Sequence, residues 1–401
     1  MTYPDDGFRL LSLYRYWNII NYFFPYKHLT DKDWNTCLAE YIPKLIKAKD
    51  ELEYELAVIQ IIGDVKDTHA NLWGGTNNKM QKQRGWNFPP FNLTFIDNNL
   101  VINDFFNPDQ RKATGLELGD IITHINGKSV NSLVKMMYNF YPASNQPTRL
   151  RDISFDILRS NDNTIDLTVY RDGKTFDKTL NLYYQKDIKG FYRWYKIEKN
   201  KPSFKKFDNN IGYITLKNIK ETDVKRIKEK LNDTKGIVVD IRNYPSAFMP
   251  FNLGSFFTSK ESPFVKFTHG NINYPGEFNF KKTKSIHPKS EVYRGKVVVL
   301  VNEITQSQGE YTAMAFRAGD NVTIIGSTTA GADGNTSKFY LPGGLMTMIS
   351  GIGVYYPDGT ETQRVGIVPD IEVLPTIKGI KEGRDEVLEK AIEIINKSDN
   401  D

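Results

Sequence analysis

Residues 297–318, VVVLVNEITQSQGEYTAMAFRA, constrain the fold of this chain more than any other stretch. The stretch opens with an unbroken apolar, mostly β-branched run, as expected of a strand buried on both faces. A short polar turn follows, and the apolar residues then recur at helical spacing. Ser307 stands where the helix begins, beside unpaired backbone N–H groups and the positive end of the helix dipole. A serine there either caps the helix, in a capping box with Glu310, or acts as a nucleophile.

The length and the pattern of the chain predict three parts. A chain of 401 residues suggests two or three domains. Residues 1–80 carry helical patterns and predict an N-terminal helical region. Residues 86–185 carry short strands with turn signals and predict a mostly β module. Residues 186–401 alternate strands with helices, which predicts an α/β core.

Residues 63–75, GDVKDTHANLWGG, replace the helical period with polar residues and glycine. Asp67, Thr68 and His69 form either a turn with Asx-type bonding or a catalytic histidine oriented by a neighbouring hydroxyl or carboxylate. No second histidine stands at ligand spacing, so a metal site is not expected. We expect His28 to lie at the surface and His124 to have a structural role.

The composition narrows the classes of function. The net charge of +5 comes from 53 basic and 48 acidic residues, and the lysines are scattered, so nucleic acid is not an expected partner. Cys37 is the only cysteine, which excludes an intrachain disulfide and a cysteine-based zinc site. No cofactor is predicted. No stretch has the 18 or so consecutive apolar residues of a membrane span, so no transmembrane segment is predicted.

Residues 115–130, GLELGDIITHINGKSV, closely resemble a PDZ domain, whose sequences commonly read GL..GD.I..ING..V. A glycine-aspartate turn precedes one strand and an asparagine-glycine turn follows it. The resemblance implies a module that takes an extended peptide, often a C-terminus, as an added edge strand.

Four further motifs resemble, in order, the serine peptidases of family S41, the C-terminal-processing and tricorn-core type. KGIVVDIRNYPSA is similar to the family's LDLRNNPGG loop, and VVVLVNEITQSQGE to its nucleophile segment VLVN..S.S..E. IIGSTTAGA is similar to VIGE.T.GK, and PDGTETQRVGIVPDIEV to PDG....GI.PD..V. The resemblance covers nearly the whole chain. It implies an α/β, crotonase-like (ClpP/crotonase) peptidase core with a helical N-terminal region and an inserted PDZ-like domain.

The resemblance implies Ser307 as the nucleophile. The processing branch of the family takes its base from a lysine, but Ala332 stands at that position and Lys338 is not expected to reach in from the same loop. The tricorn-like branch takes its base from a histidine in a D.H motif, which here gives His69. Thr68 matches a serine beside that histidine.

Two features of the implied site stay open. Glu361 and Gln363 are alternatives for orienting His69: a carboxylate better stabilises an imidazolium, whereas alignment on Gly366 favours the amide. The oxyanion hole would combine the backbone N–H of Gln308 with one from the loop at residues 240–247. Ser246 and Ala247 replace paired glycines there, and the loss of glycine conformations with positive φ is a reason to expect weaker activity.

The function implied is a serine-type endopeptidase that hydrolyses unfolded or C-terminally presented polypeptides, with Ser307 as nucleophile and His69 as base. The alternative is a catalytically weak relative that binds peptides through its PDZ-like domain, and a hydrolase of another acyl substrate is a third. Relatives are mostly exported, which implies the bacterial periplasm or cell envelope with a leader absent from this sequence. A cytoplasmic location stays open, as do the natural substrate and the oligomeric state.

Overall fold

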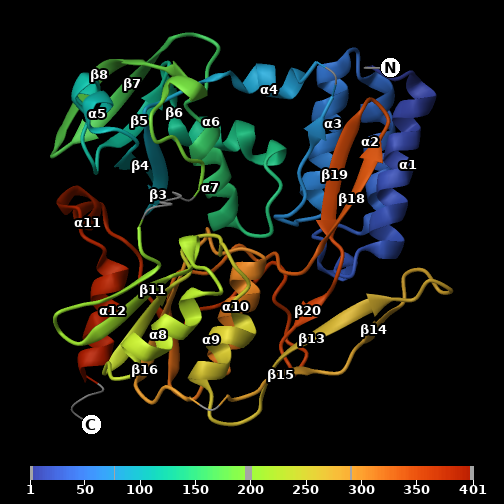
Figure 1. Cartoon of the computed structure of the whole chain (residues 1–401). Coiled ribbons are helices and arrows are strands. Elements are labelled where there is room, and N and C mark those ends of the chain that lie inside the picture. Colours follow the sequence, from blue (N-terminus) through green and yellow to red (C-terminus); the bar gives the residue numbers. More distant parts are fainter. Residues whose placement is uncertain (1–2, 76, 195–200, 290, 398–401) are drawn as a thin grey trace.

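The computed structural model describes residues 3–75, 77–194, 201–289 and 291–397 (Figure 1). Three parts are visible: a bundle of N-terminal helices, a β-rich module formed by residues 87–184, and a central sheet with helices on both faces. The α/β class expected for the third part is confirmed. The loops that carry the candidate site residues lie where the three parts meet.

The central sheet is mostly parallel. Its order is β10 (Phe204–Lys206), β11 (Ile211–Thr215), β12 (Gly236–Asp240), β16 (Lys296–Val301), β17 (Val322–Gly326) and β21 (Ile371–Glu372). Only β10 runs antiparallel to its neighbour. Because the other strands are parallel, their carboxyl ends meet at one edge of the sheet. The turn with Ser307 leaves β16 at that edge.

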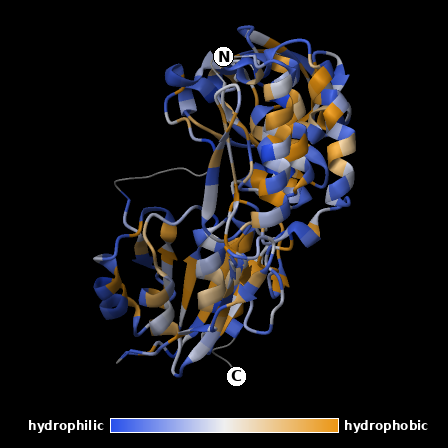
Figure 2. Ribbon diagram, turned by 90° about the vertical axis from the view of Figure 1, so that its right-hand side faces the viewer, coloured by the Kyte–Doolittle hydropathy of each residue, from blue (hydrophilic) through white to orange (hydrophobic). Residues whose placement is uncertain are grey.

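Alternate residues of the central strands face two different sets of helices. Val297, Val299 and Val301 pack into a cluster with α8 (Asp223–Leu231), α9 (Pro250–Phe257) and α10 (Gln308–Arg317). Val298 and Leu300 face α12 (Glu386–Lys397) on the other side. This double burial explains why the sequence shows an unbroken apolar run rather than an alternating one. Figure 2 shows hydrophobic residues concentrated in these strands.

The N-terminal helices α1 (Asp6–Phe23), α2 (Trp34–Lys47) and α3 (Glu51–Asp64) share a core with a distant hairpin. That hairpin, β18 (Thr336–Leu341) and β19 (Leu345–Ser350), forms a sheet with β1 (Trp73–Gly74). Phe339, Leu341, Leu345 and Ile349 are buried in the same cluster as the helices. Figure 1 shows the hairpin beside α1 and α3. A segment that the sequence assigned to the core at residues 186–401 therefore packs with the region expected at residues 1–80.

Five strands pair in chain order in the β-rich module, where the sequence predicts short strands. They are β3 (Phe91–Ile96), β4 (Asn99–Phe105), β5 (Ile121–Ile125), β7 (Thr164–Arg171) and β8 (Lys174–Asn181), paired antiparallel in that order. Asn126 and Gly127 both have positive φ, as a tight hairpin turn into β6 (Lys128–Ser129) requires. The helices α5 (Pro108–Thr114), α6 (Val130–Met137) and α7 (Gln146–Asp156) are additions that the strand pattern did not predict.

The remaining elements connect these parts. They are α4 (Lys79–Arg84), β2 (Asn87–Phe88), β9 (Tyr183–Tyr184), β13 (Ser262–Gly270), β14 (Phe278–Phe280), β15 (Lys284–Ile286), β20 (Val354–Tyr355) and α11 (Ile377–Glu382). Among the helices of the described ranges, none combines the length and the apolar character needed to cross a membrane.

Candidate active site

Ser307 occupies a strained position at the start of α10. Its backbone has φ 55° and ψ −119°, and residues other than glycine rarely adopt a positive φ. Such conformations cost about 1–3 kcal/mol and gather at functional sites. An ordinary N-cap has an extended backbone instead, so the capping role of this serine does not account for its geometry.

Glu310 fixes the backbone of Ser307. Its side chain is fully buried, and its carboxylate accepts from the backbone N–H of Ser307 at 3.0 Å, which completes the expected capping box. The same carboxylate accepts from the hydroxyl of Thr329 at 2.5 Å and from the N–H groups of Gly331 at 2.8 Å and Ala332 at 3.1 Å. Burial raises the pKa of Glu310, and these four donors oppose the shift. Glu310 thus ties the strained turn to the loop at residues 329–332.

His69 belongs to a chain of hydrogen bonds that ends at Asp67. Its Nδ1 lies 2.8 Å from Oγ of Ser350, the last residue of β19, and that hydroxyl donates to Oδ1 of Asp67 at 2.9 Å. The backbone N–H groups of Ser350 and His69 also donate to the Asp67 carboxylate, at 2.6 and 3.0 Å. The Asx-type turn expected at Asp67 is therefore present, and it is part of the same network. All three side chains are buried.

The direction of these hydrogen bonds sets the proton on the imidazole. The Ser350 hydroxyl has one hydrogen, which it donates to the Asp67 carboxylate, so its oxygen accepts from Nδ1–H of His69. In the neutral ring Nε2 then carries the lone pair. Burial lowers the pKa of His69, and the charge of Asp67 partly offsets that shift. The network therefore favours a neutral imidazole with Nε2 free to accept a proton.

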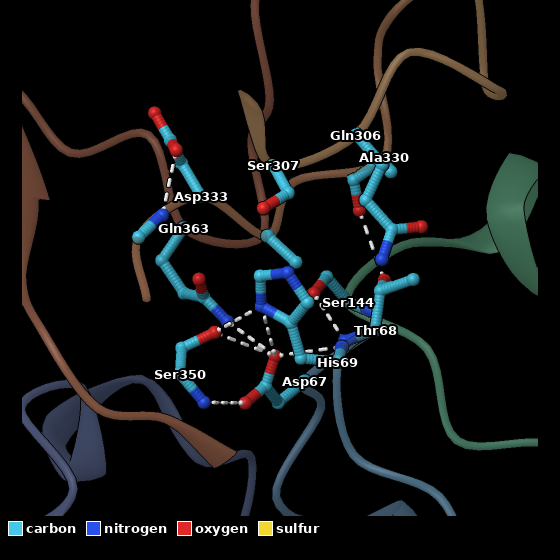
Figure 3. Close-up of polar contacts among 12 residues, drawn as sticks. Asp67, Thr68, His69, Ser144, Gln306, Ser307, Ala330, Asp333, Ser350 and Gln363 are labelled. Carbon is cyan, nitrogen blue, oxygen red and sulfur yellow. Dashed lines mark hydrogen bonds and ion pairs between the residues drawn. The ribbon is translucent and has the colours of Figure 1, made fainter. Parts of the chain in front are cut away.

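Figure 3 shows the edge of the His69 ring opposite Ser350 turned toward the side on which Ser307 lies. No direct hydrogen bond joins these two described residues. A gap between base and nucleophile is common when no substrate is bound, because such contacts tighten in the complex. The arrangement can therefore support proton transfer from Ser307 to His69.

The two candidates for orienting His69 lie in different places. Gln363 is buried, and its Nε2 donates to Oδ1 of Asp67 at 3.3 Å. Glu361 instead forms an ion pair with His28, an exposed histidine as expected. The backbone of Glu361 forms an isolated antiparallel bridge with that of Tyr355. Gln363 thus touches the network through Asp67, and Glu361 does not.

Thr68 bonds to backbone rather than to the imidazole. Its hydroxyl donates to the carbonyl of Ala330 at 3.0 Å and accepts from the N–H of Ser144 at 2.8 Å. The Ser144 hydroxyl in turn accepts from the N–H of Thr68 at 2.9 Å. Thr68 therefore fixes the histidine loop between the β-rich module and the loop at residues 329–332.

The positions considered for a lysine base are occupied as the sequence suggested. Ala332 is fully buried beside the nucleophile turn, and its carbonyl accepts from the N–H of Ser307 at 3.0 Å. Lys338 lies on β18 with an exposed side chain. In the described ranges, no group of three or more His, Cys, Asp or Glu side chains is placed to hold a metal ion.

The candidate oxyanion residues are Gln308, Ser246 and Ala247. The N–H of Ser246 donates to the carbonyl of Leu216 at 2.9 Å. Gln308 and Ala247 are tied together, because Nε2 of Gln308 donates to the Ala247 carbonyl at 2.9 Å. Neither Ser246 nor Ala247 has a positive φ, so this loop does not need the glycine conformations that the sequence comparison led us to expect.

The β-rich module also reaches the nucleophile turn. Nη1 of Arg151, on α7, donates to the carbonyl of Glu303 at 2.8 Å and to Oε1 of Gln306 at 3.2 Å. Both acceptors lie in the turn that precedes Ser307. All three parts of the chain therefore contribute contacts to the site.

Sequence reasoning missed Ser350 and Asp333. Ser350 stands in a strand with no chemical motif around it. Asp333 directly follows Ala332, is buried, and has an Oδ2 without a hydrogen-bond partner among the described residues. Burial, and then the charge of Glu310, raise the pKa of Asp333 well above its ordinary value. The only signal for Asp333 was its place in a glycine-rich loop.

A serine at a strained strand-to-helix turn, next to a histidine that a carboxylate orients, is the arrangement that defines serine hydrolases. Residues 210–373 match the model of Peptidase family S41. The motifs predicted this family, and the part of the chain that its model matches includes Ser307.

The chain is also similar to two curated proteins and to solved structures. The chain is 25% identical over 281 residues to the carboxy-terminal processing protease CtpA of Bacillus subtilis (strain 168), covering 68% of the chain and 53% of that protein. It is 28% identical over 154 residues to the nisin-resistance protein of Lactococcus lactis subsp. lactis, covering 35% of the chain and 47% of that protein. The matches thus span about half the length of these curated relatives. The structure of mature CPAF complexed with lactacystin shares the fold, with a TM-score of 0.75, 14% identity, and coverage of 98% of this chain and 99% of that one.

Proposed function

We propose that this chain is a serine endopeptidase that hydrolyses peptide bonds in unfolded or C-terminally presented polypeptides. The observation that carries the proposal is the chain of hydrogen bonds from Asp67 through Ser350 to His69, with Ser307 held in a strained conformation on the far side of the ring. The two relatives are named as a processing protease and a resistance protein, and the first name supports a peptide substrate. The central sheet would be a crotonase-like core, and the β-rich module a PDZ-like domain that presents the polypeptide.

The proposed reaction begins when Nε2 of His69 takes the hydroxyl proton of Ser307. The serine oxygen then bonds to the carbonyl carbon of the substrate, and the negative charge moves to the carbonyl oxygen. We assign the backbone N–H groups of Gln308 and Ala247 to stabilise that oxyanion. His69 returns the proton to the leaving amine as the C–N bond breaks. Water, deprotonated by His69, then hydrolyses the ester on Ser307.

Asp67 supports both proton transfers without contacting the substrate. When His69 is protonated, its Nδ1–H still donates to Ser350, whose hydroxyl donates to the Asp67 carboxylate. The negative charge at the end of the chain stabilises the imidazolium that forms in the transition state. Oδ1 of Asp67 lies 4.0 Å from Nδ1, so its charge also acts directly.

A fluorophosphonate probe tests this proposal. The probe should label Ser307 in the wild-type chain, identified by mass spectrometry, and the chain should degrade a fluorescently labelled unfolded protein. Ser307→Ala should abolish both signals, and His69→Ala should lose nearly as much. His124→Ala is the matched control, because His124 is an exposed histidine of the β-rich module. Labelling and hydrolysis that persist in Ser307→Ala or His69→Ala would contradict the site.

The alternative, a peptide-binding protein with weak catalysis, is favoured by two observations. No hydrogen bond joins His69 to Ser307 among the described residues, and the N–H of Ser246 is already committed to Leu216. This alternative predicts that peptides bind to the wild-type chain without hydrolysis and without labelling of Ser307. A location in the periplasm or cell envelope stays a prediction, which fractionation of the source cells would test.

A further inference from the structure

A cavity lies between α3, α4, β1 and β19. It has a volume of about 220 Å³. Leu72, Trp73, Met80 and Leu345 supply its apolar walls, and the Trp73 side chain is 38% exposed. The polar residues Asn78 and Gln81 also line it. One carboxylate, that of Glu55, lines the same cavity. None of these residues belongs to the network around Ser307.

Glu55 has one carboxylate oxygen that the fold does not use. The residue is only 2% exposed, and its Oε2 accepts from the N–H of Met80 at 2.8 Å, in the first turn of α4. Its Oε1 has no hydrogen-bond partner among the described residues. A buried acceptor without a donor costs free energy, and more so when it is charged. A donor brought into the cavity would remove that cost.

Gly75 lies directly against this buried oxygen. A Cβ atom at Gly75 would lie 2.5 Å from Oε1, and Gly75 has φ +77°, so a side chain there is excluded on both grounds. Lys79, the residue before Met80, is exposed, and no ion pair joins it to Glu55 among the described residues. Burial raises the pKa of Glu55, and the backbone N–H of Met80 opposes that shift. The nearby charge of Glu51 raises the pKa further, whereas the backbone N–H and the charge of Lys79 lower it.

We propose that this cavity binds a primary ammonium group on an aliphatic chain, as in a lysine side chain or a free alkylamine. The single available oxygen of Glu55 suits a point-like ammonium, whereas a guanidinium prefers a carboxylate with both oxygens free. The indole of Trp73 attracts a cation over its face, and the aliphatic walls accommodate methylene groups. An anion would be repelled by Glu55 and Glu51, and a neutral apolar ligand would leave Oε1 without a donor.

The proposed ligand would sit on the segments that carry the catalytic network. Trp73 follows His69 by four residues, and it pairs with Met346 on β19, the strand that ends at Ser350. Binding does not depend on peptidase activity, so the test below does not rest on the proposed function.

The proposal is tested by calorimetric titration of the whole protein in phosphate buffer with two ligands, n-pentylamine and n-pentanol. The two ligands have the same pentyl group and differ only in the amine or hydroxyl that they carry. The amine should bind at least about tenfold more tightly, since only it supplies a charged donor. Glu55→Gln should remove that difference, because glutamine keeps a carbonyl oxygen for the N–H of Met80 and loses the charge. Glu53→Gln is the matched control, with the same change on an exposed face of α3, and it should bind like the wild type.

Three results would overturn the proposal: no binding of the amine up to about 10 mM, equal binding of amine and alcohol, or full binding of the amine by Glu55→Gln. The limit of about 10 mM corresponds to the weak Kd expected of a single contact. Trp73→Leu, which should weaken amine binding several-fold, decides the matter if Glu55→Gln fails to fold. A peptide with one internal lysine separates the two sources of the ligand. Binding of that peptide, lost when its lysine is acetylated, would assign the site to lysine side chains of polypeptides, and binding of pentylamine alone would assign it to small amines.

Discussion

Replacement of Ser350 with alanine tests the link between Asp67 and His69. The substitution removes the hydroxyl that accepts from Nδ1 of His69 at 2.8 Å and donates to Asp67 at 2.9 Å. The backbone N–H of residue 350 still donates to Oδ2 of Asp67, so the loop keeps one of its anchors. The change therefore removes the connection to the imidazole with little rearrangement of the carboxylate.

The expected loss of activity follows from the strength of that connection. A hydrogen bond in a charge-assisted chain contributes about 1.5–3 kcal/mol, which corresponds to a loss of about ten- to a hundredfold in kcat. KM should change little, because Ser350 is buried behind His69 and does not face the substrate. Loss of the bond that stabilises the imidazolium also lowers the pKa of His69 further, so the acid limb of the pH–rate profile should move to lower pH.

The assay is steady-state hydrolysis of a labelled unfolded protein between pH 4.5 and 9, a range set about the ordinary histidine pKa. Thr347→Val is the matched control, because Thr347 is a buried residue of the same strand whose hydroxyl has no hydrogen-bond partner in the described structure. Ser350→Thr should recover part of the lost rate, since it keeps a hydroxyl. A change in kcat below about threefold in Ser350→Ala, or an equal loss in Thr347→Val, would refute the relay through Ser350, since such effects fall below one hydrogen bond.

Three further predictions concern buried charges at the site. Activity should fall as pH drops through the pKa of His69, and this midpoint should lie below the ordinary value of 6.5, because burial lowers the pKa; a midpoint above 6.5 in the pH–rate profile would contradict the burial argument. Asp333→Asn should stabilise the chain more at pH 8 than at pH 5. With a raised pKa the native carboxyl keeps a proton that the unfolded chain releases, so native stability falls by up to about 1.4 kcal/mol per pH unit in that window. Urea unfolding at pH 5 and at pH 8 measures the free energy of unfolding of the variant and the wild type. An equal stabilisation by Asp333→Asn at the two pH values would contradict the raised pKa. Glu310→Gln should destabilise the chain by about 2 kcal/mol or more, since an amide cannot accept from all four donors that the carboxylate satisfies; an unchanged urea midpoint would show that these contacts contribute little.

The sequence predicts the strands of the central sheet well because buried positions there are occupied by apolar residues. The run at residues 297–301 is apolar at every position because both faces of β16 are covered, and the turn and helix that follow place Ser307 at the sheet edge. The strands of the β-rich module are visible for a related reason, since their turns require glycine and asparagine with positive φ. Local chemistry thus reports local structure.

Contacts between segments that are distant in the sequence cannot be predicted from local residue patterns. Ser350 reaches His69 because β1 pairs with β19 across more than 270 residues, and nothing near Ser350 indicates that pairing. The choice between Glu361 and Gln363 was open for the same reason. They are two positions apart along the chain, but Glu361 faces His28 and Gln363 faces Asp67. Residue spacing alone gave no basis for deciding which side chain turned inward.

The substitution at position 332 makes the N-terminal region indispensable to the proposed chemistry. The segment that matches the family model, residues 210–373, contains Ser307, Ser350 and the oxyanion loop, but not His69 or Asp67. With Ala332 where the processing branch has a lysine, that segment holds the proposed nucleophile but not the proposed base. The base arrives on a loop that Thr68 fastens to Ala330, while the hairpin at residues 336–350 packs into the core of the N-terminal helices. Any change that separates those helices from the hairpin should therefore abolish activity while leaving the central sheet folded, because Asp67 and Ser350 approach each other only across that contact.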